Sequence, residues 1–240
     1  MTSLVVIVLF GLFIIFIAAK TKTTDTEIIV GQKRDIKEIG ERIQNVLDTE
    51  KTEKKLERKL KNVAVEASKL YKDHRFKQSE KKFLSIIKED HKNVKAYHGL
   101  GLIYLEQKEY SGASQAFEKI CELSPTNDAA FNNLGLAYFN IGKYEEAVKA
   151  YERSVALNNK VAHRFINLAL AAEKTGNLKK QVEALGKAAD LDPKNIEYLE
   201  RWGDAAQKAE DKGTAKKALQ KIIEIEPANL EAQRSLARLQ

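Results

Sequence analysis

The stretch FNNLGLAYFNIGKYEEAVKAYERSVALNN, residues 131–159, has the pattern of two short helices separated by a break. Its first half places large residues at helical spacing, at Phe131, Leu134 and Tyr138. Its second half does the same with Tyr144, Val148 and Tyr151. Gly142 lies between the halves, and a glycine just past a helix C-terminus takes the left-handed conformation without Cβ strain. The stretch therefore predicts an antiparallel helical hairpin.

The same pattern recurs along the chain with a period of 34 residues. A small residue marks each copy, and the series is Ala67, Gly101, Gly135, Ala169 and Gly203. Two columns of large residues keep the same period: Val63, Tyr97, Phe131, Phe165 and Leu199, and then Phe83, Phe117, Tyr151, Leu185 and Leu219. A period of this size in paired helices is typical of a solenoid, in which each hairpin buries its apolar face against its neighbour.

These columns resemble the tetratricopeptide repeat (TPR) family, whose unit combines a large residue, a Leu-Gly or Leu-Ala pair, two aromatics, a small residue and a late proline. The unit 94–127 supplies this pattern as Tyr97, Leu100, Gly101, Tyr104, Ala113, Phe117 and Pro125. The resemblance covers five units, over residues 60–93, 94–127, 128–161, 162–195 and 196–229, with a capping helix over 230–240. It implies an all-α fold, a right-handed TPR solenoid of about five helical hairpins and a C-terminal end helix.

Small residues recur on both helices of each predicted hairpin. We expect the small residue of the first helix to let the second helix approach closely, because Ala113, Ala147 and Ala215 face it from the other side. Two residues depart from that alanine column, Ser79 in the first unit and Gln181 in the fourth. Gln181 predicts a slightly wider fourth hairpin.

The N-terminal sequence is apolar. Residues 4–19, LVVIVLFGLFIIFIAA, carry no charge, and as a helix they would span about 24 Å, enough with flanking residues to cross a bilayer. We expect residues 1–20 to form an uncleaved transmembrane helix. A cleaved signal peptide is the alternative, although the basic segment that usually precedes the apolar run is missing. Lys20, Lys22, Lys33, Arg34 and Lys37 follow the run, and the positive-inside tendency then places the TPR part in the cytoplasm.

Residues 21–59 predict a charged linker, or helical stalk, between the anchor and the repeats. Within it, Ile36, Ile39, Ile43 and Val46 keep the spacing of a short coiled-coil seam. Glu50 and Glu53 interrupt the next heptad. The stalk therefore leaves open a homo-oligomer that forms through this seam.

Composition and motifs give no sign of catalysis. The net charge is +7 with a pI near 9.2, an excess that solubility explains and that adds no argument for nucleic acid. The four histidines, His74, His91, His98 and His163, have no partner at metal-ligand spacing, and the one cysteine is Cys121. No pair of carboxylates stands out as acid and base. We therefore predict a protein without enzymatic activity, cofactor or metal.

The TPR resemblance implies a binding surface on the first helices of the units, which in this family line a groove for partner peptides. By position, the candidate peptide-binding residues are His98, Asn132, Asn133, Asn140, Asn167, Lys174 and Arg201. Leu170, Asp204 and Lys208 belong to the same inner row. Asn133, Asn167 and Arg201 are 34 residues apart, so they predict a polar ladder that can read a peptide backbone. The clamp that chaperone-binding members use on a C-terminal carboxylate is missing, because neither possible frame has both of its lysines.

These observations predict a single-pass membrane protein that acts as an adaptor and binds partner proteins or peptides through its TPR solenoid. The alternative is a self-assembling structural scaffold of a membrane complex, in which the stalk and the ends of the solenoid make homotypic contacts.

Overall fold

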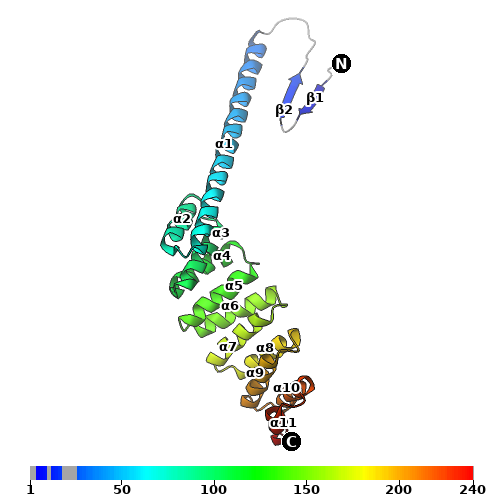
Figure 1. Ribbon diagram of the computed structural model, residues 1–240. Coiled ribbons are helices and arrows are strands. Elements are labelled where there is room, and N and C mark those ends of the chain that lie inside the picture. The colour runs from blue at the N-terminus through cyan, green and yellow to red at the C-terminus, as the bar shows by residue number, and fades with distance from the viewer. Residues whose placement is uncertain (1–3, 10–11, 18–25, 240) are drawn as a thin grey trace. The chain divides into compact units, whose positions relative to one another are not determined.

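The computed structural model describes residues 4–9, 12–17 and 26–239 (Figure 1). Within these ranges the chain forms two short strands and eleven α-helices. It divides into two compact units, Met1–Arg58 and Lys59–Gln240, and helix α1 (Thr26–Lys72) crosses the boundary between them.

The first unit contains an antiparallel strand pair, β1 (Leu4–Leu9) and β2 (Leu12–Ile17), in which Leu4 lies opposite Ile17. Both strands consist of Val, Ile, Leu and Phe, residue types that favour extended backbone. The sequence predicts one transmembrane helix over residues 1–20, and the described part of that range is this strand pair instead. Residues 1–3, 10–11 and 18–20 of the prediction lie outside the described residues. No helix in the described part of the chain combines the length and hydropathy that a bilayer crossing requires.

Helix α1 is 47 residues long, and the charged segment predicted as a stalk is helical from Thr26 onward. Ion pairs one turn apart run along its surface, such as Arg42 with Glu38 at 2.8 Å. Exposed pairs of this kind each contribute a few tenths of a kcal/mol to a helix. Two members of the predicted seam are solvent-exposed, Ile39 at 54% and Val46 at 58%.

The second unit is an array of helical hairpins, so the predicted all-α architecture is confirmed (Figure 1). Four hairpins pair α3 (Val94–Glu106) with α4 (Tyr110–Leu123), α5 (Asp128–Asn140) with α6 (Tyr144–Leu157), α7 (Ala162–Lys174) with α8 (Leu178–Leu191), and α9 (Ile196–Lys208) with α10 (Lys212–Ile225). Helix α2 (Phe76–Glu89) precedes them and α11 (Leu230–Arg238) follows. Helices α3, α5, α7, α9 and α11 begin 34 residues apart, and we call them first helices; α2, α4, α6, α8 and α10 keep the same interval and are second helices.

One left-handed residue turns the chain inside each hairpin. Gly142 has φ +79°, which confirms the prediction made from the sequence. The same loop position recurs every 34 residues, at His74, Lys108, Gly142, Gly176 and Glu210, all with positive φ. Three of these are not glycine, so their loops carry the modest cost of a Cβ in the left-handed region.

Asparagine caps begin most first helices. The side chains of Asn93, Asn127, Asn195 and Asn229 each accept a hydrogen bond from the backbone N–H three residues on, at 3.0–3.2 Å. This satisfies one of the free N–H groups at a helix start. In the fourth unit Val161 takes the position, and α7 has no side-chain cap. The sequence analysis missed this asparagine column, although its spacing of 34 is visible in the sequence.

Gly101 and Gly135 on the first helices accommodate aromatic rings of the second helices, a contact that the sequence analysis did not predict. A Cβ on Gly101 would lie 2.7 Å from the Phe117 ring, and one on Gly135 would lie 2.7 Å from the Tyr151 ring. Both rings are buried to 2% exposure or less. Gly203 differs, because a Cβ there would meet only Ala218, at 3.4 Å.

Candidate functional site

Side chains on neighbouring first helices, and on α1 and α3, form links between residues 35 apart. In the second unit, the Tyr71 hydroxyl at the end of α1 lies 3.4 Å from a carboxylate oxygen of Glu106 on α3. Asn167 on α7 donates to Asn132 on α5 at 3.1 Å, and Lys208 on α9 donates to Glu173 on α7 at 3.1 Å. Helices α5 and α7 also contact each other directly. We call the surface that carries these links, with Asn132, Asn167, Glu173, Arg201 and Lys208, the first-helix face.

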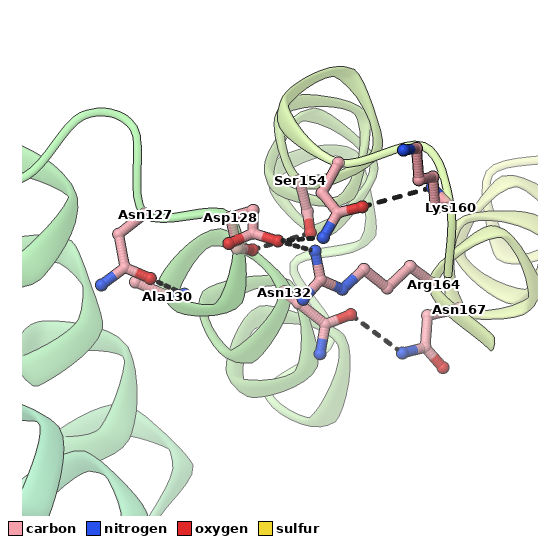
Figure 2. A network of polar contacts seen from close by, with 9 residues as sticks. Asn127, Asp128, Ala130, Asn132, Ser154, Lys160, Arg164 and Asn167 are labelled. Atoms are coloured by element: carbon pink, nitrogen blue, oxygen red, sulfur yellow. Dashed lines mark hydrogen bonds and ion pairs between the residues drawn. The ribbon is translucent and has the colours of Figure 1, made fainter. Parts of the chain in front are cut away.

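The link between Asn132 and Asn167 is the central polar contact of this face (Figure 2). A carboxamide has two donor hydrogens and an acceptor oxygen, so each side chain keeps hydrogen-bonding capacity beyond this one bond. The predicted ladder of Asn133, Asn167 and Arg201 was a row of side chains for a bound peptide, and it stays a prediction. The structure adds that one of its members, Asn167, is hydrogen-bonded to Asn132, a residue 35 positions earlier.

The other candidate residues lie in different environments on their helices. Asn133 is half-buried on α5, and Lys174 is exposed in the last turn of α7. Asn140 is exposed and donates to the Leu136 carbonyl of its own helix at 2.8 Å. His98 packs edge-on against the Phe117 ring of α4, with ring centroids 6.2 Å apart, and burial lowers its pKa, so the neutral imidazole is favoured at pH 7.

Asp128, the first residue of α5, connects three helices in a group that we call the Asp128 cluster: Asp128, Ser154, Asn158 and Arg164 (Figure 2). Its carboxylate accepts hydrogen bonds from Asn158, at the end of α6, and from the Arg164 guanidinium on α7. The buried Ser154 hydroxyl donates to the Asp128 carbonyl at 2.8 Å. Arg164 holds the pKa of Asp128 below its ordinary value, with Asn158 as the second cause. This cluster fixes α5 relative to α7, and the sequence analysis did not identify it.

A pocket of about 110 Å³ opens between α7, α8 and α9. Its polar and apolar lining comes from Leu170 and Glu173 of α7, Gln181 and Leu185 of α8, and Arg201, Asp204 and Lys208 of α9. Arg201 is 34% exposed and reaches Glu197 of its own helix at 3.5 Å, a distance that leaves its guanidinium loosely held. The predicted groove residue Arg201 therefore lies in the wall of a pocket.

Gln181 is 6% exposed, and its Oε1 atom has no hydrogen-bond partner in the described part of the chain. Glu173, in the same wall, has its pKa lowered, first by the hydrogen bond from Lys208. The sequence predicted that Gln181 widens the fourth hairpin, and the structure places it in the pocket wall. Glu173 was missed, although Glu173 and Lys208 are opposite charges 35 residues apart.

The Cys121 thiol and the potential metal-ligating side chains show no sign of reactive chemistry in the described part of the chain. Burial, aided by Glu118, raises the pKa of the Cys121 thiol to about 11, so the thiol is protonated and a weak nucleophile near neutral pH. Among the residues that the structure describes, no group of three or more His, Cys, Asp or Glu side chains is placed to hold a metal ion.

Comparison with protein families identifies the array. The family "Tetratricopeptide repeat" matches residues 129–160 and again residues 162–195, and the family "TPR repeat" matches residues 101–142. Residues 101–195 are tetratricopeptide repeats. This TPR region contains α5 to α8 complete, and hence the Asn132–Asn167 link, the Asp128 cluster and the α7 and α8 walls of the pocket.

Solved structures agree on the fold. One MamA protein is 24% identical with a TM-score of 0.64, and the match covers 72% of this chain and 94% of that one. MamA from Desulfovibrio magneticus RS-1 is 23% identical with a TM-score of 0.61, covering 71% and 96%. YrrB, described as a TPR protein with an unusual peptide-binding site, is 21% identical with a TM-score of 0.59, covering 70% and 87%. A search of curated proteins gives no match.

Proposed function

We propose that the protein is an adaptor whose first-helix face holds an extended segment of a partner protein. The observation that carries the proposal is the link between Asn132 and Asn167, which presents two carboxamides side by side on neighbouring hairpins. An extended peptide offers alternating N–H and C=O groups, and a carboxamide can pair with either. Such a pair recognises backbone more than side chains. The likeness of the fold to YrrB, a protein with a peptide-binding site, supports the proposal.

Photocrosslinking in cells tests this function. Leu136 is 37% exposed and lies one turn after Asn132 on α5, so a crosslinking residue at position 136 would face the bound segment. We expect position 136 to capture a partner, and Asn132→Ala with Asn167→Ala to reduce that capture. A crosslinker at the exposed position 149, on the second helix α6, is the matched control. Equal capture from positions 136 and 149 would contradict a role for the first-helix face.

For the N-terminal segment, we propose attachment to a membrane, with the TPR region on the cytoplasmic side. The support comes from sequence: residues 4–19 are uncharged and apolar, and Lys20, Lys22 and Lys33 follow them. We expect the full chain to remain with membranes after carbonate extraction, and a chain that begins at residue 26 to be released. Protease added to intact cells or vesicles reports the side on which the TPR region lies. Release of the full chain by carbonate would contradict the attachment.

Self-association through α1 is a second candidate function, of the scaffold type. Its specific support is the exposure of Ile39 and Val46, two apolar residues of the predicted coiled-coil seam. Sedimentation velocity over a range of concentrations distinguishes the two functions. A larger species that Ile39→Asp and Val46→Asp abolish together would favour the scaffold, whereas a monomer at every concentration favours the adaptor.

A further inference from the structure

The positive charge of the second unit is concentrated at its beginning. Residues 59–95, which contain the last turns of α1, all of α2 and the start of α3, carry eleven basic and five acidic side chains, a net charge of +6. Residues 96–240 carry twenty of each kind, so their net charge is zero. Solubility is served by charges of both signs spread over a surface. An excess of one sign at one end indicates an anionic partner there.

One side of α2 forms the most regular part of this basic region. Four exposed residues follow one another there at intervals of four, three and four, and they are Lys77, Lys81, Leu84 and Lys88. We call them the α2 ridge. The buried side chains of Ser79, Phe83 and Ile86 lie on the opposite side of the helix, and the Ser79 hydroxyl donates to the Ala67 carbonyl of α1 at 2.8 Å. Packing against α1 and α3 therefore holds the ridge in a fixed position.

The α2 ridge differs from the same four positions of the other second helices. Its three lysines give it a charge of +3. At successive intervals of 34 residues, the equivalent positions carry −2 on α4, −1 on α6, −1 on α8 and zero on α10. The place of Leu84, which is 46% exposed, is taken there by Glu118, Glu152, Gly186 and Gln220. The packing that all five second helices share therefore does not account for the ridge.

The lysines of the ridge have no charged partner among the described residues. Neither Lys77, Lys81 nor Lys88 takes part in any ion pair of that part of the chain. Lys77 lies in the first turn of α2, where the helix dipole disfavours a cation, and only Lys88, in the last turn, is favoured by it. The nearby carboxylate of Glu80 accepts a hydrogen bond from the Tyr104 hydroxyl at 2.9 Å. The ridge therefore presents positive charge that an external anion can neutralise.

We infer that the α2 ridge binds the surface of a membrane that contains anionic phospholipids. The three lysines would lie near the lipid phosphates, and Leu84 between them would enter the boundary between headgroups and acyl chains. A flat lipid surface can contact a protruding ridge along its whole length. The inference goes beyond the proposed membrane attachment, which uses residues 4–19, because the ridge is a separate contact made by the second unit.

Nucleic acid is another large polyanion, and the ridge suits it less. Proteins that bind single strands stack the bases on exposed aromatic side chains, and proteins that read duplexes bring arginine to the base edges. The ridge contains neither residue type. Its exposed Leu84 would face a charged phosphate backbone, whereas a bilayer offers this side chain an apolar environment.

Photocrosslinking of the full-length chain to vesicles tests the contact at the ridge itself. One set of vesicles is phosphatidylcholine, and the other is an equal mixture of phosphatidylcholine and phosphatidylglycerol. Both contain a trace of labelled phosphatidylcholine, so capture of the label reports contact with the bilayer. We expect a crosslinking residue at position 84 to capture at least tenfold more label from the mixed vesicles, and high salt to abolish the difference. A crosslinker at the exposed position 149 of α6 should capture little from either.

Two triple variants with the same change in net charge assign the contact to the ridge. Lys77→Gln, Lys81→Gln and Lys88→Gln together should reduce capture from position 84 by more than tenfold, since each lysine near an anionic surface contributes about fivefold in binding. The matched control replaces three exposed lysines of α6 and α8 by glutamine, at positions 149, 179 and 187, and should leave capture unchanged. Circular dichroism checks that both variants fold.

The ridge and the proposed attachment fail in different ways. Equal capture from the two kinds of vesicle, no capture from position 84, or equal loss in the two triple variants would overturn the ridge as a membrane contact. Binding of duplex DNA or RNA that depends on the same three lysines and displaces the vesicles would overturn it in favour of nucleic acid. Carbonate extraction is independent of these results, because a chain attached through residues 4–19 stays with membranes even when the ridge lysines are replaced.

Discussion

Asp128 on α5 and Arg164 on α7 form an ion pair between neighbouring first helices (Figure 2). The Arg164 side chain is 12% exposed and that of Asp128 is 29% exposed, so water screens the pair only in part. The Nε atom of Arg164 is buried and has no partner in the described residues, which makes the contact with Asp128 more important for this guanidinium. The pair therefore sets how the α5–α6 and α7–α8 hairpins meet.

Asp128→Asn should destabilise the TPR array by about 2 kcal/mol at pH 7, because it leaves the Arg164 charge without its partner. For an array of this size the thermal midpoint should fall by about 4–8 °C. Circular dichroism during heating measures the change. Glu122→Gln, which removes an exposed ion pair with Lys119 within α4, is the control and should shift the midpoint by far less.

The effect of Asp128→Asn should depend on pH in a defined direction. Arg164 and Asn158 lower the pKa of Asp128 in the folded protein, so the ionised carboxylate stabilises the fold above the unfolded pKa of about 3.9. This stability is lost as the pH falls through the folded pKa. The difference in stability between the wild type and the variant should be complete above about pH 5 and should shrink below about pH 4. A difference that stays constant from pH 7 to pH 3 would contradict the ion pair as its cause.

Gly135→Ala should destabilise the array by about 1–3 kcal/mol through overpacking. Its new Cβ would lie 2.7 Å from the Tyr151 ring, which is only 2% exposed. Gly203→Ala is the matched control, since its Cβ would meet Ala218 at an ordinary 3.4 Å and the change favours helix formation. Urea denaturation compares the two variants, and equal loss of stability in both would disprove the aromatic-ring explanation.

Val161→Asn should stabilise the array by about 1 kcal/mol, because it restores the cap that the other first helices have. Val161 has φ −116° and ψ 99°, whereas the Asn127 cap has φ −80° and ψ 91°, so a modest backbone change places the side chain correctly. Thermal unfolding measures the gain, and Asn127→Val should produce a loss of similar size. No gain from Val161→Asn would mean that the start of α7 is held by its packing.

The sequence predicted the hairpin array because each column of the repeat has a local cause. Gly142 gave the loop its left-handed residue, and the spacing of Phe131, Tyr138 and Tyr151 gave two amphipathic helices. Periodicity alone did not show which atoms fill the space beside Gly135. That space depends on how the Tyr151 side chain of the second helix is oriented, which a repeat pattern leaves open.

The sequence placed the candidate residues on first helices, but it did not predict that Asn167 bonds to Asn132. A period of 34 in the sequence suggests contacts 34 apart, whereas contacts across first helices also depend on their relative rotation and shift. Those two quantities come from three-dimensional packing, and they bring Asn167 to Asn132 and Lys208 to Glu173. The unpaired Oε1 of Gln181 could not be foreseen for the same reason, since the residues that line the pocket with Gln181 come mainly from helices α7 and α9.

The double variant Asn132→Ala with Asn167→Ala tests the first-helix face without damage to the fold. The two amides bond to each other and are half-buried, so removing both leaves no unpaired partner, and stability should change by less than about 1 kcal/mol. Binding should change far more, because peptide groups of a bound segment would lose their partners at a cost of about 1–3 kcal/mol each. Capture of the partner by a crosslinker at position 136 should therefore fall about tenfold or more. Lys149→Ala, on the exposed surface of α6, should leave capture unchanged. If the double variant captures the partner as well as the wild type does, the partner is held elsewhere on the chain, and the exposed seam of α1 becomes the next surface to test.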